Sequence, residues 1–106
     1  MAVTTIGGNV LAAGVIVRSL TPASVAANTT AEQTFTFPGV RVGDFVEVNA
    51  PGITAGVDLG NTRVSAADTI AIAFQNSTAG GLTPPAGNYV CFVVRPEVVG
   101  AASFAP

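Results

Sequence analysis

The sequence has no histidine, no lysine and no tryptophan, and it has a single cysteine, Cys91. These absences remove most of the side chains that serve as general bases, nucleophiles and metal ligands. A single cysteine also cannot form a disulfide within the chain. Because Cys91 lies between apolar neighbours, we expect a buried and unreactive thiol. The composition therefore predicts a protein that is not an enzyme and that uses no cofactor.

Charge is equally scarce. Four arginines and six acidic residues make up 9% of the 106 residues and leave a net charge of −2. Binding to a nucleic-acid backbone needs several basic contacts, so no nucleic-acid partner is expected. A free protein surface normally carries about 25–35% charged residues. We therefore expect part of this surface to be covered by a neighbour, in a homo-oligomer that is a trimer or a dimer.

The carboxylates are the remaining candidates for chemistry. Nothing in their spacing brings two of them together as a glycosidase requires. The segment 58–61 has a faint likeness to a calcium loop, but the other ligand positions are missing. The preferred interpretation is that the aspartates cap turns and that Glu32 and Glu47 lie on solvated strand faces. No metal and no small-molecule substrate are expected.

Apolar residues make up 49% of the chain, so a membrane segment has to be considered. The longest uncharged stretch, 69–94, is interrupted by Gln, Asn, Gly and Pro and does not match a spanning helix of about 20 apolar residues. The apolar segment 6–17 is short, and the first cation, Arg18, follows it instead of preceding it. We expect neither a signal peptide nor a transmembrane span.

Small and β-branched residues dominate what is present. The chain has 18 Ala, 16 Val and 12 Thr against 4 Leu, and turn signals such as Pro-Gly and Gly-Asn divide it into short pieces. This combination favours strands over helices. It predicts an all-β fold, a small antiparallel β-sandwich or jelly-roll-like barrel of about 6–8 short strands.

Alternation of apolar and polar residues locates the strands. Phe35 and Phe37 are expected to face the core, and Ala71 and Ala73 to lie on the outside of their strand. The last strand is apolar on both faces, so it is expected to be central in its sheet or covered by a neighbour. The expected strands are 15–20, 30–37, 44–49, a short one at 63–65, 68–75 and 89–95.

The ends of the chain differ from the middle. Segments 1–14 and 97–106 alternate weakly, and their apolar residues suit contact with a neighbouring subunit. We divide the chain into an N-terminal arm or edge strand (1–14), a sandwich domain (15–96) and a C-terminal arm (97–106). Arginines pair bidentately with carboxylates at interfaces, although local pairs such as Arg41 with Asp44 or Glu47 are an equally simple role. The interface candidates are Arg18, Arg95, Val98, Val99, Phe104, Ile6 and Leu11.

Four segments together resemble a known group of proteins. They are VGDFVEV (42–48), RVSAADTIAI (63–72), FQNSTAG (74–80) and TPPAGNY (83–89). The chain from about 15 to 95 is similar to small β-sandwich domains of tailed-bacteriophage virions, most of all to capsid decoration (cement) proteins. None of these motifs is catalytic, and turn geometry by itself accounts for their glycines and prolines.

The resemblance implies a viral structural protein that is assembled in the bacterial cytoplasm and resides on the capsid surface. Its expected partner is the major capsid protein, and its expected role is to bind the outside of the phage head and stabilise it against internal pressure. The alternative is a tail or fibre domain that binds another virion protein or a host-surface receptor. That alternative needs exposed aromatic residues on loops, for which Tyr89 and Phe104 are the candidates.

Overall fold

The structure is a computed structural model that describes residues 8–98 of the chain. This part contains six strands and no helix, so the expected all-β fold is confirmed. The strands are β1 (Val10–Leu20), β2 (Thr29–Thr36), β3 (Phe45–Asn49), β4 (Val57–Ala66), β5 (Thr69–Asn76) and β6 (Gly87–Pro96).

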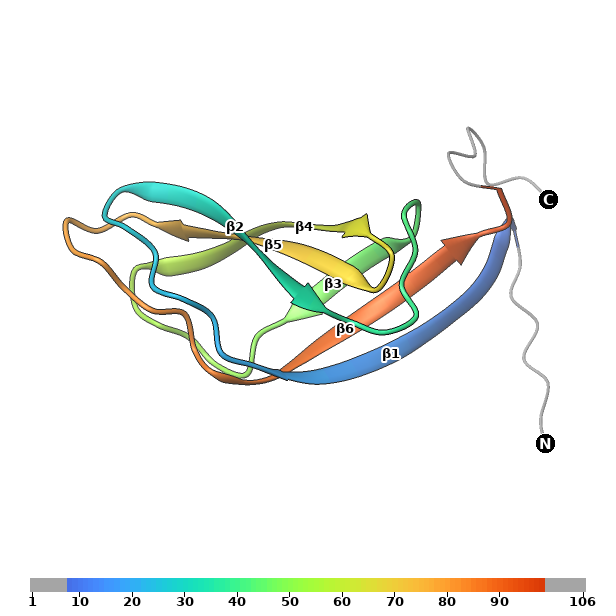
Figure 1. Ribbon diagram of the computed structural model, residues 1–106, viewed down its shortest axis with the longest axis horizontal. Coiled ribbons are helices and arrows are strands. Elements are labelled where there is room, and N and C mark those ends of the chain that lie inside the picture. Colours follow the sequence, from blue (N-terminus) through green and yellow to red (C-terminus); the bar gives the residue numbers. More distant parts are fainter. Residues whose placement is uncertain (1–7, 99–106) are drawn as a thin grey trace.

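The strands form two three-stranded sheets with the orders β1-β6-β3 and β2-β5-β4, which pack face to face as a small sandwich (Figure 1). All strand pairings are antiparallel. The last strand, β6, is the central strand of its sheet, as expected, but only its inner face is buried, with Tyr89 and Cys91, whereas Val90 and Phe92 on the other face are exposed. The two sheets are connected on the β3/β4 side, where the hydroxyl of Thr62 donates a hydrogen bond to the carbonyl oxygen of Val46 (3.1 Å).

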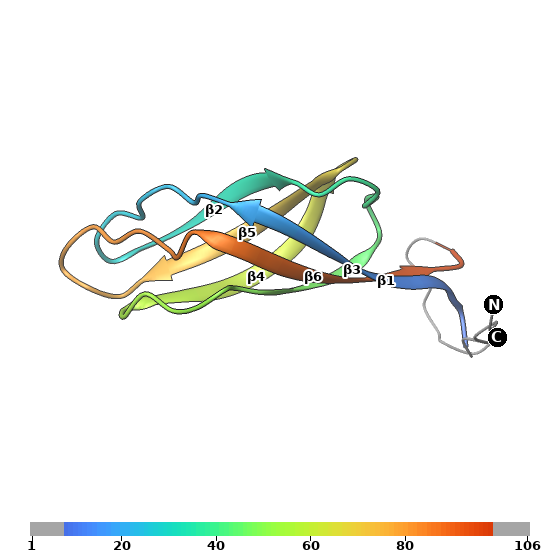
Figure 2. The ribbon, with the colours of Figure 1, turned by 90° about the horizontal axis from the view of Figure 1, so that it is seen from below.

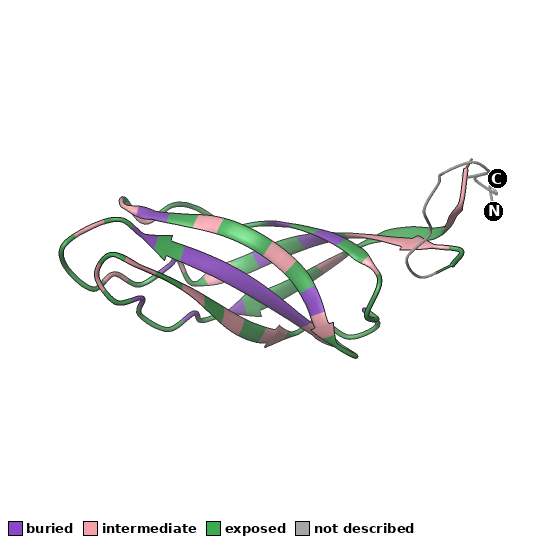
Figure 3. Cartoon of the chain, turned by 90° about the horizontal axis from the view of Figure 1, so that it is seen from above, coloured by how far each residue is buried: buried purple, intermediate pink, exposed green. Residues whose placement is uncertain are grey.

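The core fills the space between the two sheets, and β5 is its most buried strand (Figure 3). Phe37, Ile70, Ile72, Phe74 and Tyr89 have no exposed surface. The rings of Phe35 and Phe74 meet edge to face, with centroids 6.5 Å apart. The expectation that Phe35 and Phe37 face the core is confirmed, because Phe37, directly after β2, belongs to the core and Phe35 of β2 packs against it.

The fourth strand is longer than the sequence suggested. Its expected extent was 63–65, whereas β4 runs from Val57 to Ala66. The Gly60-Asn61 pair had the composition of a turn, but in the structure it lies inside the strand at a shift of register between Leu59 and Thr62. A bulge accommodates such residues without ending the strand.

Ala71 and Ala73 are on the outside of their strand, as expected, but both are buried. They lie on the outer side of β5, next to Arg63 of β4 and Glu32 of β2 respectively. Two strand spacings separate β4 from β2, about 9–10 Å. The side chains of Arg63 and Glu32 nevertheless meet at 2.8 Å, so they extend over β5 from both sides. The small alanines leave room for this ion pair and are covered by it.

The first strand begins at Val10 instead of at residue 15, and it lies at the edge of its sheet. Residues 10–14 belong to this strand. With the end of β6, they continue the sheet beyond the second sheet as an overhang (Figure 2). The two ends of the described chain meet there, since the amide of Glu97 donates to the carbonyl oxygen of Asn9 (2.7 Å).

Candidate protein-binding surface

The outward side of the sheet β1-β6-β3 is apolar and open to solvent. Alternation turns one set of side chains inward and the other outward, and the register places the outward set in neighbouring rows. Each member is at least 36% exposed, and Val15 and Phe45 are 62% and 60% exposed. We call this surface the outer apolar face, and it consists of Val15, Val17, Phe45, Val90 and Phe92.

The outer apolar face carries few charged side chains. The three strands of the sheet contain three charged residues, Arg18, Glu47 and Arg95. Arg18 lies on the same side of β1 as the inward residues Ile16 and Leu20, and Arg95 is bound to Asp44 as described below. Glu47 is therefore the charge that belongs to the outer face. Contiguous exposed apolar patches on soluble proteins commonly mark interaction sites. A flat face with two aromatic rings and one carboxylate is suited to contact with another protein.

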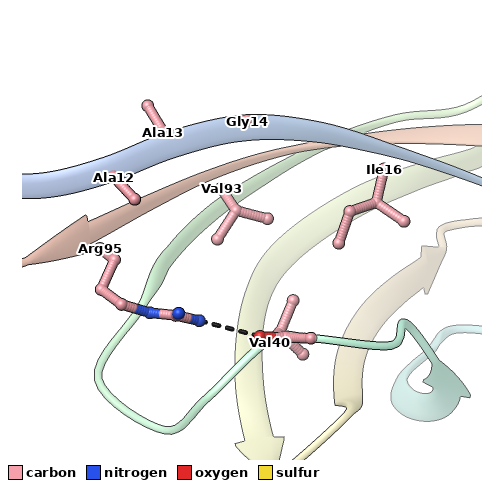
Figure 4. Close-up of a pocket in the computed structure, with 8 residues that line it drawn as sticks. Ala12, Ala13, Gly14, Ile16, Val40, Val93 and Arg95 are labelled. Carbon is pink, nitrogen blue, oxygen red and sulfur yellow. Dashed lines mark hydrogen bonds between the residues drawn. The ribbon is translucent and has the colours of Figure 1, made fainter.

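An apolar hollow of about 210 Å³ lies under the overhang, on the opposite side of the sheet from the outer apolar face (Figure 4). Ile16, Val93 and Arg95 point into it from β1 and β6, and Val40 faces them from the loop after β2. A cavity of about 150 Å³ is large enough to hold benzene. The hollow therefore has room for one apolar side chain of a neighbour. Its lining is Ala12, Ala13, Gly14, Ile16, Gly39, Val40, Val93 and Arg95.

A partly buried ion pair holds one wall of this hollow. Arg95 binds both carboxylate oxygens of Asp44, at 2.9 and 2.7 Å, and donates to the carbonyl oxygen of Gly39 at 2.8 Å. The backbone amide of Arg41 also donates to Asp44 (2.9 Å). The hydrogen bonds from Arg95 lower the pKa of Asp44, and the amide of Arg41 adds to this effect. Arg41 was a candidate partner for Asp44 through its side chain, but its amide makes the contact, and Arg95 supplies the charge.

We expect Asp44→Ala to lower the free energy of unfolding by about 2 kcal/mol, because three hydrogen bonds to a charged group are lost. The side chains of Asp44 and Arg95 are 2% and 22% exposed, so solvent screens this pair less than it screens a fully exposed one. Glu32→Ala is the matched control: it removes the equally short pair with Arg63, but those side chains are 39% and 54% exposed, and exposed pairs contribute little. Urea unfolding of both variants measures the difference.

The pH dependence of the same variants has a defined sign. A carboxyl whose pKa is lowered in the folded state contributes stability that is fully present above its unfolded pKa, about 3.9. That stability is lost as the pH falls through the lower, folded pKa. Unfolding curves of wild type and Asp44→Ala should therefore converge in strong acid, and equal losses at pH 7 for Asp44→Ala and Glu32→Ala would contradict this account.

At the other end of the sandwich, one buried amide ties the connecting loops together. The Asn76 side chain donates to the carbonyl oxygens of Val25 (3.0 Å) and Gly80 (2.8 Å). It accepts hydrogen bonds from the amide and the hydroxyl of Thr78, at 2.9 and 2.7 Å. The loops at this end, 21–28, 50–56 and 77–86, contain no charged residue. Ile53, at 92% exposure, is the most exposed large apolar residue of the described chain.

Cys91 and Tyr89 are both buried in the core. Within residues 8–98, no three His, Cys, Asp or Glu side chains lie close enough to hold a metal ion. Burial raises the pKa of Cys91 to about 11, with a further contribution from Glu47, so its thiol is protonated at neutral pH. Tyr89, a candidate for an exposed aromatic contact, is buried instead, and its hydroxyl donates to the carbonyl oxygen of Pro85 (2.7 Å).

Four of the seven predicted interface residues lie within the described part of the chain. Leu11 and Val98 are exposed, by 63% and 65%. Leu11 lies near Arg95 at the start of β1, and Val98 follows Glu97, whose amide is bound to Asn9 at the same end. Arg18 is exposed towards the other end of β1. Arg95 is engaged within its own chain, so its charge is already neutralised by Asp44. Ile6, Val99 and Phe104 lie outside the described residues.

Sequence reasoning missed the two aromatic side chains of the outer apolar face. Phe45 alternates with Val46, and Phe92 with Cys91, so the pattern placed each opposite a buried residue. The signal was the presence of large apolar residues on both faces of two strands in one sheet. This signal also fits strands that are covered on both sides, and the tertiary structure alone identified which face stays open.

No family model matches the sequence, and neither the curated proteins nor the solved structures contain a significant match. Because the described residues form strands without a helix, they include no helix that is long and apolar enough to cross a membrane. The open surfaces of the fold are therefore the basis for assigning a role.

Proposed function

We propose that the protein is a structural component of a tailed-phage particle, a capsid decoration (cement) protein that binds the outside of the head and stabilises it against internal pressure. The outer apolar face carries this proposal. A sandwich of this size buries its own core without that face, and the exposed valines and phenylalanines are then available to the major capsid protein. The sequence resemblance to decoration proteins supplies the identity of the partner.

The proposed mechanism is mechanical. Covering the outer apolar face would stabilise the contact by roughly 25 cal/mol per Å² of apolar area removed from water. A decoration protein repeats the same contact over the shell, so modest individual affinities combine when neighbouring sites are linked. Because the face carries few charges, we expect the attachment to depend less on salt than an attachment through exposed ion pairs.

The copy number of the chain in purified particles tests the proposal. Quantitative mass spectrometry of particles made from the genome that encodes this chain should find it in an amount comparable to that of the major capsid protein. Washing at high salt should leave it bound. Absence of the chain from purified particles would contradict a virion role.

The second candidate, a tail or fibre domain, is favoured by the uncharged loop end with Ile53 at its tip. Loops at one end of a rigid sandwich are a common place for recognition. This candidate predicts a few copies per particle, located at one vertex or at the tail. A count of that size would replace the decoration role with the tail role.

A further inference from the structure

The free edge of β1 is the most unusual surface of this fold. Strand β1 pairs with β6 along one side, and no other strand of residues 8–98 pairs with its other side. The edge is 11 residues long, and Leu11 to Val15 are all exposed because the overhang lacks a second sheet beneath it. An edge strand presents a row of backbone amides and carbonyls that is a template for another strand.

The other three edges of the sandwich carry features that discourage such pairing. Strand β2 has Glu32, and its ion pair with Arg63 crosses the sheet. Strand β3 has five residues and carries Glu47. Strand β4 has Asp58 and Arg63 and two shifts of register. Charges, bulges and short length are the devices by which natural proteins protect an edge.

Strand β1 lacks these devices over most of its length. Its first eight residues, VLAAGVIV, contain neither a charge nor a proline, and the one charge of the strand, Arg18, lies near its end. The single shift of register falls at its start, between Val10 and Ala12. Left open, such a strand would promote disordered aggregation. A defined partner along this edge removes that risk.

We propose that a second copy of this chain binds to this edge, with the two β1 strands antiparallel across a two-fold axis. Across a two-fold axis the same strand supplies both sides of the interface, so the uncharged edge of β1 meets an equally uncharged edge. The two sheets would then join into one of six strands, in the order β3-β6-β1-β1-β6-β3.

The side chains restrict the register of this pairing. The apolar outer faces become continuous when odd-numbered residues of one strand oppose odd-numbered residues of the other, because a slip by one residue turns each side chain to the opposite face. A centre at Gly14 satisfies this condition. It places Ala13 opposite Val15 of the second copy, and it keeps the two Arg18 side chains apart. The pairing doubles the outer apolar face that the proposed function requires, so it sharpens the assembly part of that proposal.

Charge variants of the purified protein test the pairing. Analytical ultracentrifugation should show the wild type at twice its mass of 10.5 kDa. The double variant Ala13→Lys/Val15→Lys should be monomeric, because four lysines would meet across the axis, and so should Ala13→Glu/Val15→Glu. A mixture of the two double variants should form a heterodimer. The substituted positions are exposed on the outer side of β1, so both variants should melt as folded proteins.

The matched control is Phe45→Lys/Asn49→Lys, which adds the same charge to the same sheet face at the far edge, on β3. This control should remain dimeric. The proposal would be overturned if the wild type were a monomer or a trimer, or if the lysine variant and the glutamate variant each formed dimers by themselves. Dissociation of the β3 control into monomers would also overturn it. Hydrogen exchange adds an independent readout: alternate amides of β1 should be protected in the dimer and exchange at least tenfold faster in the lysine variant.

Failure of this inference and failure of the proposed function are distinguishable. The pairing is measured on purified protein without particles, whereas the virion role is measured by the amount of the chain on particles. A monomeric chain that is abundant on particles would remove the pairing and keep the decoration role. A dimer that is absent from particles would do the reverse.

Discussion

Asn76→Asp is expected to lower the free energy of unfolding by about 3–5 kcal/mol at neutral pH, a large part of the stability of a domain this size. The amide nitrogen of Asn76 lies 3.0 and 2.8 Å from two carbonyl oxygens. An oxygen in its place turns two hydrogen bonds into two repulsive contacts, and it brings a buried negative charge without a cationic partner. The loops that meet at Asn76 should loosen together.

Acid should partly rescue this variant. Burial and the facing carbonyl oxygens raise the pKa of the introduced carboxyl above its unfolded value of about 3.9. The penalty is therefore complete above the raised pKa, and it declines as the pH falls towards the unfolded value, where the protonated acid can donate one hydrogen bond. Chemical denaturation at several pH values measures this trend.

The neighbouring residue provides the control. Gln75→Glu makes the same amide-to-acid change one position earlier, where the side chain is exposed. It should change the free energy of unfolding by less than about 0.5 kcal/mol. Equal losses for the two variants, or a loss for Asn76→Asp that does not depend on pH, would contradict the role given to the Asn76 hydrogen bonds.

The double variant Phe45→Ser/Phe92→Ser is expected to weaken attachment to the phage head by about 100-fold or more. Aromatic anchors at the centre of an interface commonly contribute about 2 kcal/mol or more each, and each 1.4 kcal/mol is a factor of ten. Both rings lie on the outer apolar face and are exposed, so their removal should leave the melting temperature nearly unchanged. Titration of the variant onto particles that lack the chain measures the affinity.

Ile53→Ser is the matched control for this experiment, because Ile53 is still more exposed but lies at the loop end, away from the outer apolar face. It should bind particles as the wild type does. If the Phe45/Phe92 variant binds normally and the Ile53 variant does not, the loop end would be the attachment site, and the tail or fibre role would gain support.

Much of the fold follows from local patterns. Strands β2, β3 and β5 were located to within a residue or so, because strict alternation of apolar and polar residues has one structural interpretation. Strand β4 was underestimated because Gly60 and Asn61 have turn composition, and a bulge depends on the neighbouring strand. For the first part of β1, the sequence left open whether segment 1–14 is an arm or an edge strand, because residues 11–14 do not alternate; the structure places residues 10–14 in the edge strand β1.

The candidate surface was less accessible to sequence reasoning. The scarcity of charge indicated a covered surface, but the composition does not say where charges lie. Arg95 looked like an anchor for a neighbour because it stands alone in an apolar segment. Its partner, Asp44, is 51 residues earlier in the chain, and only folding places them at 2.7 Å.

The sequence by itself determined that this is an all-β protein, that its chemistry is poor in catalytic groups, and that its surface is short of charge. These properties are local or additive, so each residue contributes to them regardless of its neighbours in space. The tertiary structure decided which apolar residues form the core and which form the outer apolar face, because this depends on the pairing order of the sheets. It also decided that, among residues 8–98, no strand pairs with the second side of β1, because the position of a strand in its sheet depends on which strands fold beside it.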